Sequence, residues 1–230
     1  MSLIKMLGWI CGVLLVWAYF QLPSGSGDVA SRQTLSVSEE PGRIVLGWSG
    51  PVREPMSERV ATAIDRYKAD QRRLVLVLNS PGGSIEHGRR VVAAIRARGR
   101  AIDTLVQKAG VCASMCVPIF LAGRERIADP EAYFMFHQVS LSLGGKDNAK
   151  RREFSETEKA RYSDIVKSVE TRATDEFFRS DIGIRGVSAS WLARMREKIS
   201  GPGRDIWMSG QQLVDEGSGI VDRLVRTPAR

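Results

Sequence analysis

The sequence predicts an α/β fold with a mostly parallel sheet and flanking helices. Short apolar runs alternate with longer amphipathic segments, an order that repeated strand-helix-strand units produce. The clearest run, residues 74–78, reads Leu-Val-Leu-Val-Leu and is apolar at every position, as in parallel strands buried on both faces. With 230 residues, 43% of them hydrophobic and 26% charged, the chain suits one globular domain and a short extension.

The first half of the predicted domain alternates regularly between strands and helices. Residues 43–48 form an apolar run between turn-forming residues, which predicts a strand, and a helix is expected over 57–68. After the central strand, apolar residues recur on one face of a helix over 85–97. A further strand is expected over 101–106, followed by a short helix that reaches Leu121.

The second half contains a much longer helix. Residues 132–136 predict another strand, and the small, polar, Gly-containing segment 140–150 predicts a loop. A charged helix is expected over 155–179. A helix over 209–216 and a strand over 219–224 close the domain.

The amino terminus has the pattern of a membrane-targeting segment. Lys5 precedes an apolar stretch over residues 6–20, and the next charge is Asp28. We therefore expect residues 1–22 to be a membrane anchor or a signal peptide. Residues 23–41, rich in Ser, Gly and polar groups, are predicted to be a flexible linker.

Retention and cleavage of this segment both remain open. Trp17 and Tyr19 favour a retained anchor, whereas Ser24, Gly25 and Ser26 could form a small-residue cleavage site. The positive charge on the short leading side is expected to keep that end in the cytoplasm. The domain is then predicted to be membrane-anchored and extracytoplasmic, or periplasmic after cleavage.

Three segments carry residues that suit catalysis. Residues 79–83 read Asn-Ser-Pro-Gly-Gly, residues 110–116 read Gly-Val-Cys-Ala-Ser-Met-Cys, and residues 134–138 read Phe-Met-Phe-His-Gln. Each is placed where a predicted strand ends, and sites in open α/β sheets lie at such ends. A serine nucleophile requires an imidazole base, a group that orients the imidazole, and N–H donors for the oxyanion.

These segments resemble the proteolytic subunit of the Clp protease, in the ClpP/crotonase superfamily. In that family a strand ending in Asn-Ser-Pro-Gly-Gly precedes a Gly-x-x-Ala-Ser-Met turn, and a strand ending in His-Gln follows. The resemblance implies that Ser114 is the nucleophile and His137 the base. It also implies that the backbone N–H groups of Gly82 and Met115 form the oxyanion hole.

The same resemblance implies the third member of a triad. The family's aspartate opens an Arg-Asp-x-hydrophobic-hydrophobic-Ser segment, which residues 204–209 match, so Asp205 takes that position. The spacer between His137 and Asp205 is longer than the family usually shows, and Asp175 and Asp181 remain open as alternatives. The order Ser, His, Asp argues against an α/β-hydrolase, in which the acid precedes the histidine.

The likeness runs from about Gly42 to about Val225 and implies a ClpP-like serine peptidase domain over 42–226, with a tail at 227–230. In that family the position of the long helix at 155–179 holds a projecting handle helix that packs subunit rings together. A homo-oligomer is therefore implied, and no cofactor is required.

The cysteines and the second histidine have ordinary structural interpretations. Cys112 and Cys116 flank Ser114, and we expect them to be buried and unbridged because linking consecutive helical turns strains a disulfide. A disulfide remains open if the compartment is oxidising. No metal is expected, because only two histidines occur and no acidic cluster joins the cysteines. His87 is predicted to be an exposed helical residue.

The positive charge does not indicate nucleic-acid binding. Lys and Arg number 34 and Asp and Glu 26, giving a net charge of +8. The basic residues are spread over predicted helices beside acidic ones, and no basic motif is interleaved with aromatic residues. We interpret them as solvated helix faces, possible neighbours of anionic lipid.

The sequence therefore predicts a membrane-associated or periplasmic ClpP-like serine peptidase that hydrolyses peptides or proteins through a Ser-His-Asp triad. We expect no ATPase unfoldase as partner, because such unfoldases reside in the cytoplasm. Three alternatives remain open: a signal-peptide-peptidase-like enzyme with a Ser-Lys dyad using Lys108, a crotonase-like acyl-CoA enzyme, and an inactive membrane-tethered interaction module.

Overall fold

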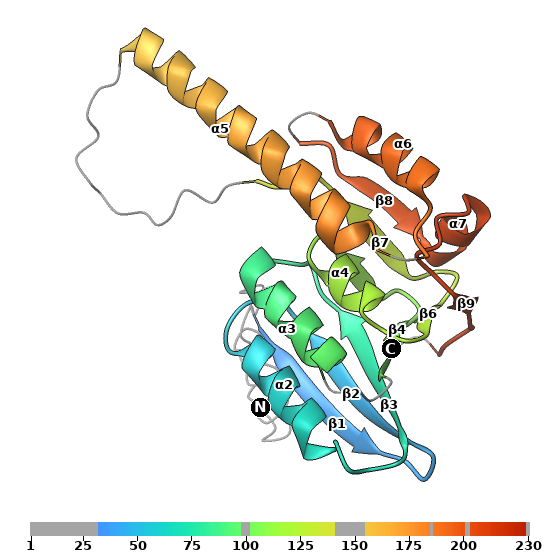
Figure 1. The fold of residues 1–230 in the computed structure, drawn as a ribbon. Helices are drawn as coiled ribbons and strands as arrows, with labels where there is room; N and C mark the ends of the chain where they lie inside the picture. Colours follow the sequence, from blue (N-terminus) through green and yellow to red (C-terminus); the bar gives the residue numbers. More distant parts are fainter. Residues whose placement is uncertain (1–31, 98–101, 141–154, 185, 201–202, 229–230) are drawn as a thin grey trace, which may run out of the picture. The chain divides into compact units, whose positions relative to one another are not determined.

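The computed structural model confirms the α/β class, with two sheets and flanking helices (Figure 1). It describes residues 32–97, 102–140, 155–184, 186–200 and 203–228. From Gln33 onward the chain forms one compact unit. No helix in these described ranges is both long and apolar enough to cross a membrane. The predicted anchor or signal segment at 1–22 lies outside the described residues.

The larger sheet has six strands in the order β1-β2-β3-β4-β6-β9. Its strands are β1 (Thr34–Glu39), β2 (Arg43–Ser49), β3 (Arg73–Asn79), β4 (Ile102–Val106), β6 (Arg126–Ala128) and β9 (Arg223–Leu224). β1 is antiparallel to β2, and every other neighbouring pair is parallel. Residues 74–78 of β3 are all buried, as their uninterrupted apolar sequence predicts.

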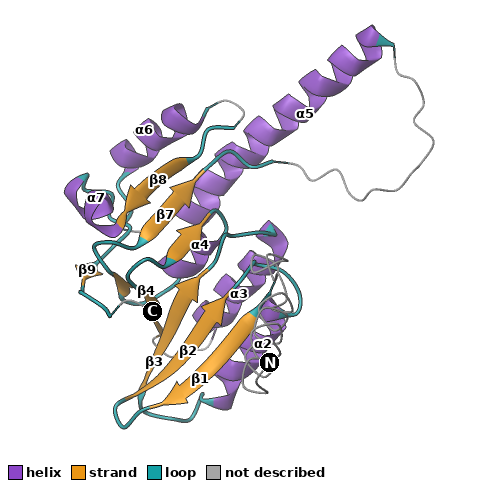
Figure 2. Ribbon diagram, turned by 180° about the vertical axis from the view of Figure 1, so that it is seen from behind, coloured by secondary structure: helices purple, strands orange, loops and turns teal. Residues whose placement is uncertain are grey.

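A smaller sheet of three strands contains the segments that precede Ser114 and His137 and follow Asp205 (Figure 2). Its strands are β5 (Val111–Ala113), β7 (Tyr133–Phe136) and β8 (Ile206–Ser209), in the order β5-β7-β8. β5 is parallel to β7, and β8 is antiparallel to β7. A parallel bridge between Ser80 and Cys112 connects this sheet to the chain that continues from β3.

The helices differ in how much of their surface they bury. They are α2 (Met56–Arg66), α3 (Ile85–Ala97), α4 (Cys116–Leu121), α5 (Glu156–Glu176), its π-helical continuation η2 (Phe177–Ile182), α6 (Ala189–Ile199) and α7 (Gly210–Asp215). Figures 1 and 2 show α2 and α3 covering the same face of the larger sheet. Every residue of α4 is buried, whereas α5 extends away from both sheets, as a handle helix does.

Aromatic contacts fix the smaller sheet against its helices. The Phe134 ring of β7 packs edge-on against Phe120 of α4, with 5.2 Å between the ring centroids. On the next buried position of β7, Phe136 packs in the same way on Trp191 of α6, at 5.3 Å. Such offset aromatic pairs add stability beyond the area that they bury. β7 is therefore held firmly on its buried face.

One predicted boundary is wrong. The flexible linker was expected to continue to residue 41, yet Thr34–Glu39 forms β1 and pairs along its whole length with β2. Polar and apolar residues alternate in Thr-Leu-Ser-Val-Ser-Glu, which is the period of an edge strand with one face in solvent. The polar composition of the stretch obscured this short pattern.

Besides β1, four elements of the structure were not predicted, and one is shorter than expected. β5 and β6 have only three residues each, too few for a periodic signal, and α6 and β8 lie in a segment for which no element was expected. The closing strand was expected over 219–224, but only Arg223–Leu224 pairs with β6. Gly219 has a φ of 71°, a left-handed conformation that does not continue a strand.

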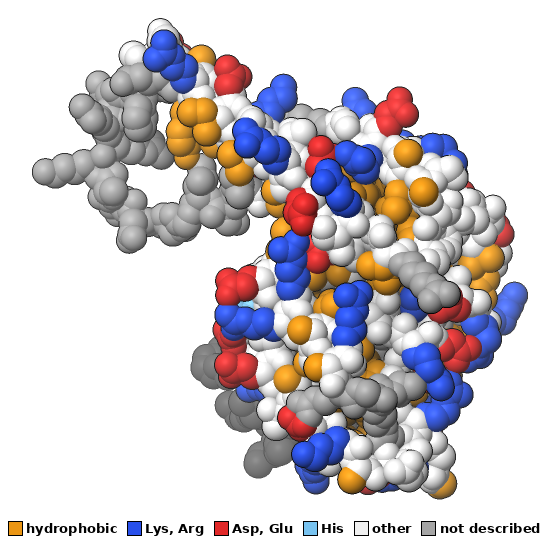
Figure 3. Space-filling model, viewed as in Figure 1, with side chains coloured by type: hydrophobic (Ala, Val, Ile, Leu, Met, Phe, Trp, Pro, Cys, Tyr) orange, Lys and Arg blue, Asp and Glu red, His pale blue; other side chains and the backbone are white. Residues whose placement is uncertain are grey.

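Charged side chains of both signs are mixed on the face of the molecule shown in Figure 3. Lys and Arg lie beside Asp and Glu over α3 and α5, and ion pairs such as Arg90 with Glu86 and Arg89 with Asp181 account for part of this mixing. The distribution agrees with the interpretation of the basic residues as solvated helix faces.

A buried arginine ties the carboxyl-terminal segment to the larger sheet. The guanidinium of Arg126 in β6 is nine-tenths buried and donates to both carboxylate oxygens of Asp222, which also accepts the Arg126 backbone N–H at 2.9 Å. Burial alone would raise the pKa of Asp222, but the hydrogen bonds from Arg126 outweigh it and lower the pKa.

We predict that Asp222→Asn lowers the free energy of unfolding by about 1–3 kcal/mol, because it leaves the Arg126 charge buried without its counter-ion. Because the pKa of Asp222 is lower in the folded protein than in the unfolded chain, the ion pair contributes its full stabilisation above the unfolded-state pKa. This stabilisation is lost as the pH falls through the folded-state pKa of Asp222. The difference in free energy of unfolding between wild type and Asp222→Asn, measured by urea unfolding, should therefore become smaller at acidic pH. Glu40→Gln, which breaks the exposed Arg43–Glu40 pair, is the control and should change stability by less than about 0.5 kcal/mol. Equal effects of the two substitutions would contradict the prediction.

Candidate active site

Ser114 occupies a sharp turn between β5 and α4. Its φ is 51°, in the left-handed region that residues with a Cβ rarely adopt. The turn is fixed on both sides: the Ser114 N–H donates to the Met135 carbonyl of β7 at 2.9 Å, and the Ser114 carbonyl accepts from the Val117 N–H at 3.0 Å. Ser114 is half-buried while its neighbours Ala113 and Met115 are buried. Backbone conformations of this kind occur at sites where a side chain must be presented in a fixed direction.

Gly82 lies directly against this turn. A Cβ atom at position 82 would come within 2.5 Å of the Ala113 carbonyl oxygen, 2.7 Å of Ser114 Cβ and 3.0 Å of the Met115 nitrogen. The φ of Gly82 is 86°, which a glycine adopts without steric cost. The predicted nucleophile and both predicted oxyanion donors are therefore in one place, and only glycine fits at position 82.

The loop that carries Gly82 is held from two directions. On one side, the Val52 N–H donates to the Gly82 carbonyl at 2.7 Å, and the Ser84 N–H donates to the Val52 carbonyl at 2.8 Å. On the other side, the Ala113 N–H donates to the Ser80 carbonyl at 3.0 Å. The backbone of the Gly-Gly loop is thus fixed against the strand that delivers Ser114.

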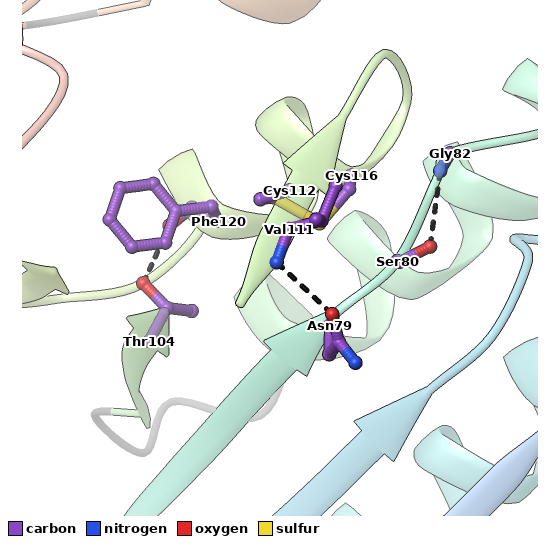
Figure 4. Close-up of a disulfide and its surroundings, with 8 residues drawn as sticks. All are labelled: Asn79, Ser80, Gly82, Thr104, Val111, Cys112, Cys116 and Phe120. Atoms are coloured by element: carbon purple, nitrogen blue, oxygen red, sulfur yellow. Dashed lines mark hydrogen bonds between the residues drawn. A yellow bond between two sulfur atoms is a disulfide. The ribbon is translucent and has the colours of Figure 1, made fainter. Parts of the chain in front are cut away.

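Two side chains that the sequence analysis did not single out contribute to this loop (Figure 4). Asn79 Oδ1 accepts the Val111 N–H at 3.0 Å and so joins the end of β3 to the start of β5. Ser80 Oγ accepts the Gly82 N–H at 3.2 Å. Both residues lie in the Asn-Ser-Pro-Gly-Gly segment, and the signal that could have identified them was a pair of short polar side chains just before a turn.

Pairing of β7 with β8 determines where His137 and Asp205 lie. Phe136 at the end of β7 is opposite Ile206 at the start of β8, in an antiparallel ladder. The paired residues end there. His137 follows Phe136 and Asp205 precedes Ile206, so both residues lie directly beyond this last pair of the ladder. His137 is half-buried and Asp205 is exposed.

The carboxyl ends of β5 and β7 and the amino end of β8 therefore meet at one edge of the smaller sheet, with Ser114, His137 and Asp205 on the three successive strand ends. Among the described residues, no hydrogen bond joins these three side chains to one another. Catalytic hydrogen bonds are often long in the free enzyme and tighten when substrate binds.

The competing acids lie elsewhere and have other partners. Asp181, in η2, accepts from Arg89 of α3 at 3.0 and 2.7 Å. Asp175, in α5, forms an ion pair with Arg196 of α6. Neither residue belongs to the smaller sheet.

Lys108, the alternative base, is displaced from Ser114. Lys108 lies in the turn between β4 and β5, at the opposite end of β5 from Ser114, and its Nζ is 3.0 Å from a Glu131 carboxylate oxygen. His87, in α3, has its Nδ1 3.1 Å from the carboxylate of Glu54.

Cys112 and Cys116 form a disulfide, contrary to the expectation of two unbridged side chains (Figure 4). That expectation assumed that both residues lie on consecutive turns of one helix. The structure instead places Cys112 in β5 and Cys116 at the first residue of α4. The turn at Ser114 brings their Cα atoms to 5.1 Å, within the usual range for a disulfide.

No cluster of three or more His, Cys, Asp or Glu side chains suited to a metal ion occurs in the part of the chain that the structure describes. A cavity of about 940 Å³ lies between α5 and α6 and is bordered by Gln138, the residue after His137. Its lining includes Tyr162, Arg196 and the alternative acid Asp175, but not Ser114, His137 or Asp205. The cavity therefore adjoins the candidate site and is not the site itself.

Comparison with known proteins relates the chain to one family and one fold. The sequence profile of the Clp protease family matches residues 42–228. The chain is 28% identical over 211 residues to the ATP-dependent Clp protease proteolytic subunit 1 of Streptomyces avermitilis, an alignment that covers 89% of this chain and 83% of that protein. A solved structure of a ClpP1 mutant from Listeria monocytogenes superposes with a TM-score of 0.59 at 18% identity, over 80% of this chain and 91% of that one. At that identity the superposition shows the fold, and it confirms the predicted ClpP-like architecture.

Proposed function

The chain belongs to the Clp protease family, and on that premise we propose that it is a serine peptidase in which Ser114, His137 and Asp205 form the catalytic triad. The observation that carries the proposal is the meeting of three strand ends at one edge of the smaller sheet, each with one of these residues. The left-handed turn at Ser114 supports it further, because sparsely populated backbone conformations cluster at active sites.

In the proposed reaction, His137 takes the Ser114 hydroxyl proton as Oγ bonds to the peptide carbonyl carbon, and the carbonyl π electrons move to the oxygen. The tetrahedral intermediate collapses, the C–N bond breaks, and His137 returns the proton to the leaving nitrogen. Water, activated by the same imidazole, then hydrolyses the acyl-enzyme and restores Ser114. Each carboxylate, imidazole and hydroxyl needed is supplied by this chain, so the mechanism requires no cofactor.

The oxyanion is proposed to bind the N–H groups of Met115 and Gly82. Both belong to backbone that is already fixed, so little reorganisation is needed when the negative charge develops. The Gly82 N–H donates to Ser80 Oγ at 3.2 Å, and this hydrogen bond must be exchanged for one to the oxyanion. A hydroxyl acceptor is weaker than an oxyanion, which favours the exchange in the transition state.

Asp205 is proposed to accept the imidazole N–H of His137 and hold its productive tautomer. The register of β7 and β8 supports this assignment, since His137 and Asp205 directly adjoin its last pair, Phe136 with Ile206. Asp175 and Asp181 are less suitable because each is engaged by an arginine on a helix outside the smaller sheet.

The rival functions fit the geometry less well. A Ser-Lys dyad would need Lys108 beside Ser114, but the two residues lie at opposite ends of β5. A crotonase-like acyl-CoA enzyme would use the oxyanion loop without a serine nucleophile, so it would not account for the strained turn at Ser114. An inactive interaction module differs from the proposed enzyme only in reactivity, so experiment must separate them.

An extracytoplasmic location is also proposed. It rests on Lys5 and the apolar segment that follows, and the Cys112–Cys116 disulfide supports it because disulfides persist in oxidising compartments. The Streptomyces relative is called ATP-dependent, but a domain outside the cytoplasm would work without an ATPase unfoldase.

A homo-oligomer is proposed from the surface of α5. Tyr162, Ile165 and Val169 are 53%, 61% and 41% exposed and recur at the spacing of one helix face. Figure 3 shows hydrophobic side chains along this projecting helix. Contact with α5 of a second copy would cover them.

We predict that Ser114→Ala abolishes peptide hydrolysis and labelling by a fluorophosphonate, with a loss on the order of a millionfold in rate. Removing one hydroxyl at a half-buried turn leaves almost no cavity, so circular dichroism and the unfolding midpoint should be unchanged. His137→Ala should lose labelling as well, whereas Lys108→Ala should keep it. Loss with Lys108→Ala and not with His137→Ala would indicate the Ser-Lys dyad, and an unlabelled wild type would indicate the inactive module.

We predict that Asp205→Asn lowers kcat roughly ten-thousandfold with little change in stability, because the imidazole then takes the wrong tautomer. Asp175→Asn and Asp181→Asn are matched controls, since each neutralises an aspartate without touching the smaller sheet. Both should retain most of the turnover. If Asp205→Asn stays active and a control fails, the acid has been misassigned; if all three stay active, the site works as a dyad.

A topology measurement tests the location. Alkaline phosphatase fused after residue 230 should be active, because this reporter requires export to form its own disulfides. If the segment is retained as an anchor, the protein should also fractionate with membranes. A cytoplasmic reporter such as green fluorescent protein, fused at the same position, provides the opposite readout. Reporter activity confined to the cytoplasm would overturn the location and the argument against an ATPase partner.

A further inference from the structure

The disulfide encloses the centre of the proposed site. Cys112 lies two residues before Ser114 and Cys116 two residues after it, so the closed loop contains Ala113, Ser114 and Met115. This loop therefore holds both the proposed nucleophile and one of the two proposed oxyanion donors. Both cysteines are completely buried, at 0% exposure.

The turn inside the loop has a conformation that needs support. Ser114 is one of two described residues other than glycine with a positive φ, the other being Ala109. Opening the turn would move Ser114 and the Met115 N–H together, since they are adjacent. The Met115 side chain is buried against Gly88 of α3, where a Cβ would come within 2.3 Å of Met115 Cγ, so the turn is also anchored from behind.

We propose that the Cys112–Cys116 disulfide is a positioning element of the active site: it holds the turn so that Ser114 and the Met115 N–H face the substrate carbonyl, and the peptidase activity therefore depends on its oxidation. The inference rests on the proposed function. Cys112 and Cys116 do not touch substrate and act through the backbone between them.

The redox step involves a dithiol reductant. One thiolate of the reductant attacks a sulfur of the disulfide and forms a mixed disulfide, and its second thiol then displaces the remaining cysteine. Two electrons and two protons pass to Cys112 and Cys116, and the reductant leaves as a disulfide. Because both sulfurs are buried, the attack requires local opening of the β5–α4 turn, so reduction should be slow under native conditions.

The test uses the full-length protein and dithiothreitol as the reductant. Alkylation under denaturing conditions should modify one of the three cysteines, Cys11, before reduction and all three after it, as read by mass spectrometry. Peptide turnover and the rate of fluorophosphonate labelling are measured on the oxidised, reduced and reoxidised protein. We expect kcat and the labelling rate to fall at least about tenfold on reduction, KM to change less than about twofold, and both rates to recover on reoxidation, since a misplaced oxyanion donor affects the transition state.

Two variants complete the test. Cys112→Ala with Cys116→Ala should have the low rates of the reduced protein and no response to dithiothreitol. Cys11→Ser should keep the wild-type rates and the full response. If the double variant fails to fold by circular dichroism, the reduction and reoxidation of the wild type still decide the matter.

The outcomes separate this inference from the proposed function. If oxidised wild type labels at Ser114 and reduction changes neither kcat nor the labelling rate, the positioning role is overturned and the peptidase remains. Alkylation of all three cysteines before any reduction would overturn it as well. If oxidised wild type does not label at all, the proposed function fails and this inference fails with it.

Discussion

The hydrogen-bonded ladder of the smaller sheet is the constraint on which the candidate site depends. Ser114 receives its position from β5, His137 from β7 and Asp205 from β8, and none of these strands exceeds four residues. Strands this short are stable only when packed, and β7 is held by edge-on aromatic contacts to α4 and α6. Loss of those contacts would shift the three proposed catalytic positions at once, although none of these three residues takes part in them.

Close backbone approach is the second requirement of the site. The Gly82 loop and the Ser114 turn lie so near each other that a single methyl group at position 82 would overlap a carbonyl oxygen and Ser114 Cβ. Hydrogen bonds keep both backbone segments in place: the Gly82 carbonyl accepts from the Val52 N–H, and the Ser114 N–H donates to the Met135 carbonyl. The proposed oxyanion donors are therefore held by backbone hydrogen bonds of the fold itself, which couples the stability of the fold to the proposed chemistry of the site.

Sequence patterns predicted most of this arrangement where the local signal was strong. The sequence alone indicated the buried run of β3, the helix Ile85–Ala97 and the order of the three motifs along the chain. The sequence could not reveal β5 and β6, because three-residue strands have no period, nor the β7–β8 register, which depends on pairing across a long separation. The disulfide was missed for a related reason: its feasibility depends on the left-handed φ of Ser114, which no residue type encodes.

That left-handed φ also explains why a cross-link is useful in this turn. A residue with a Cβ in this region is disfavoured by roughly 1–2 kcal/mol. Closing a loop as short as the one between Cys112 and Cys116 removes unfolded-state entropy worth about 2 kcal/mol in the chain-entropy description. The two terms are similar in size, so the disulfide can offset the conformational cost of presenting Ser114. Such an offset persists only where the disulfide stays oxidised, so the conformation of the turn and the redox state of Cys112 and Cys116 are linked.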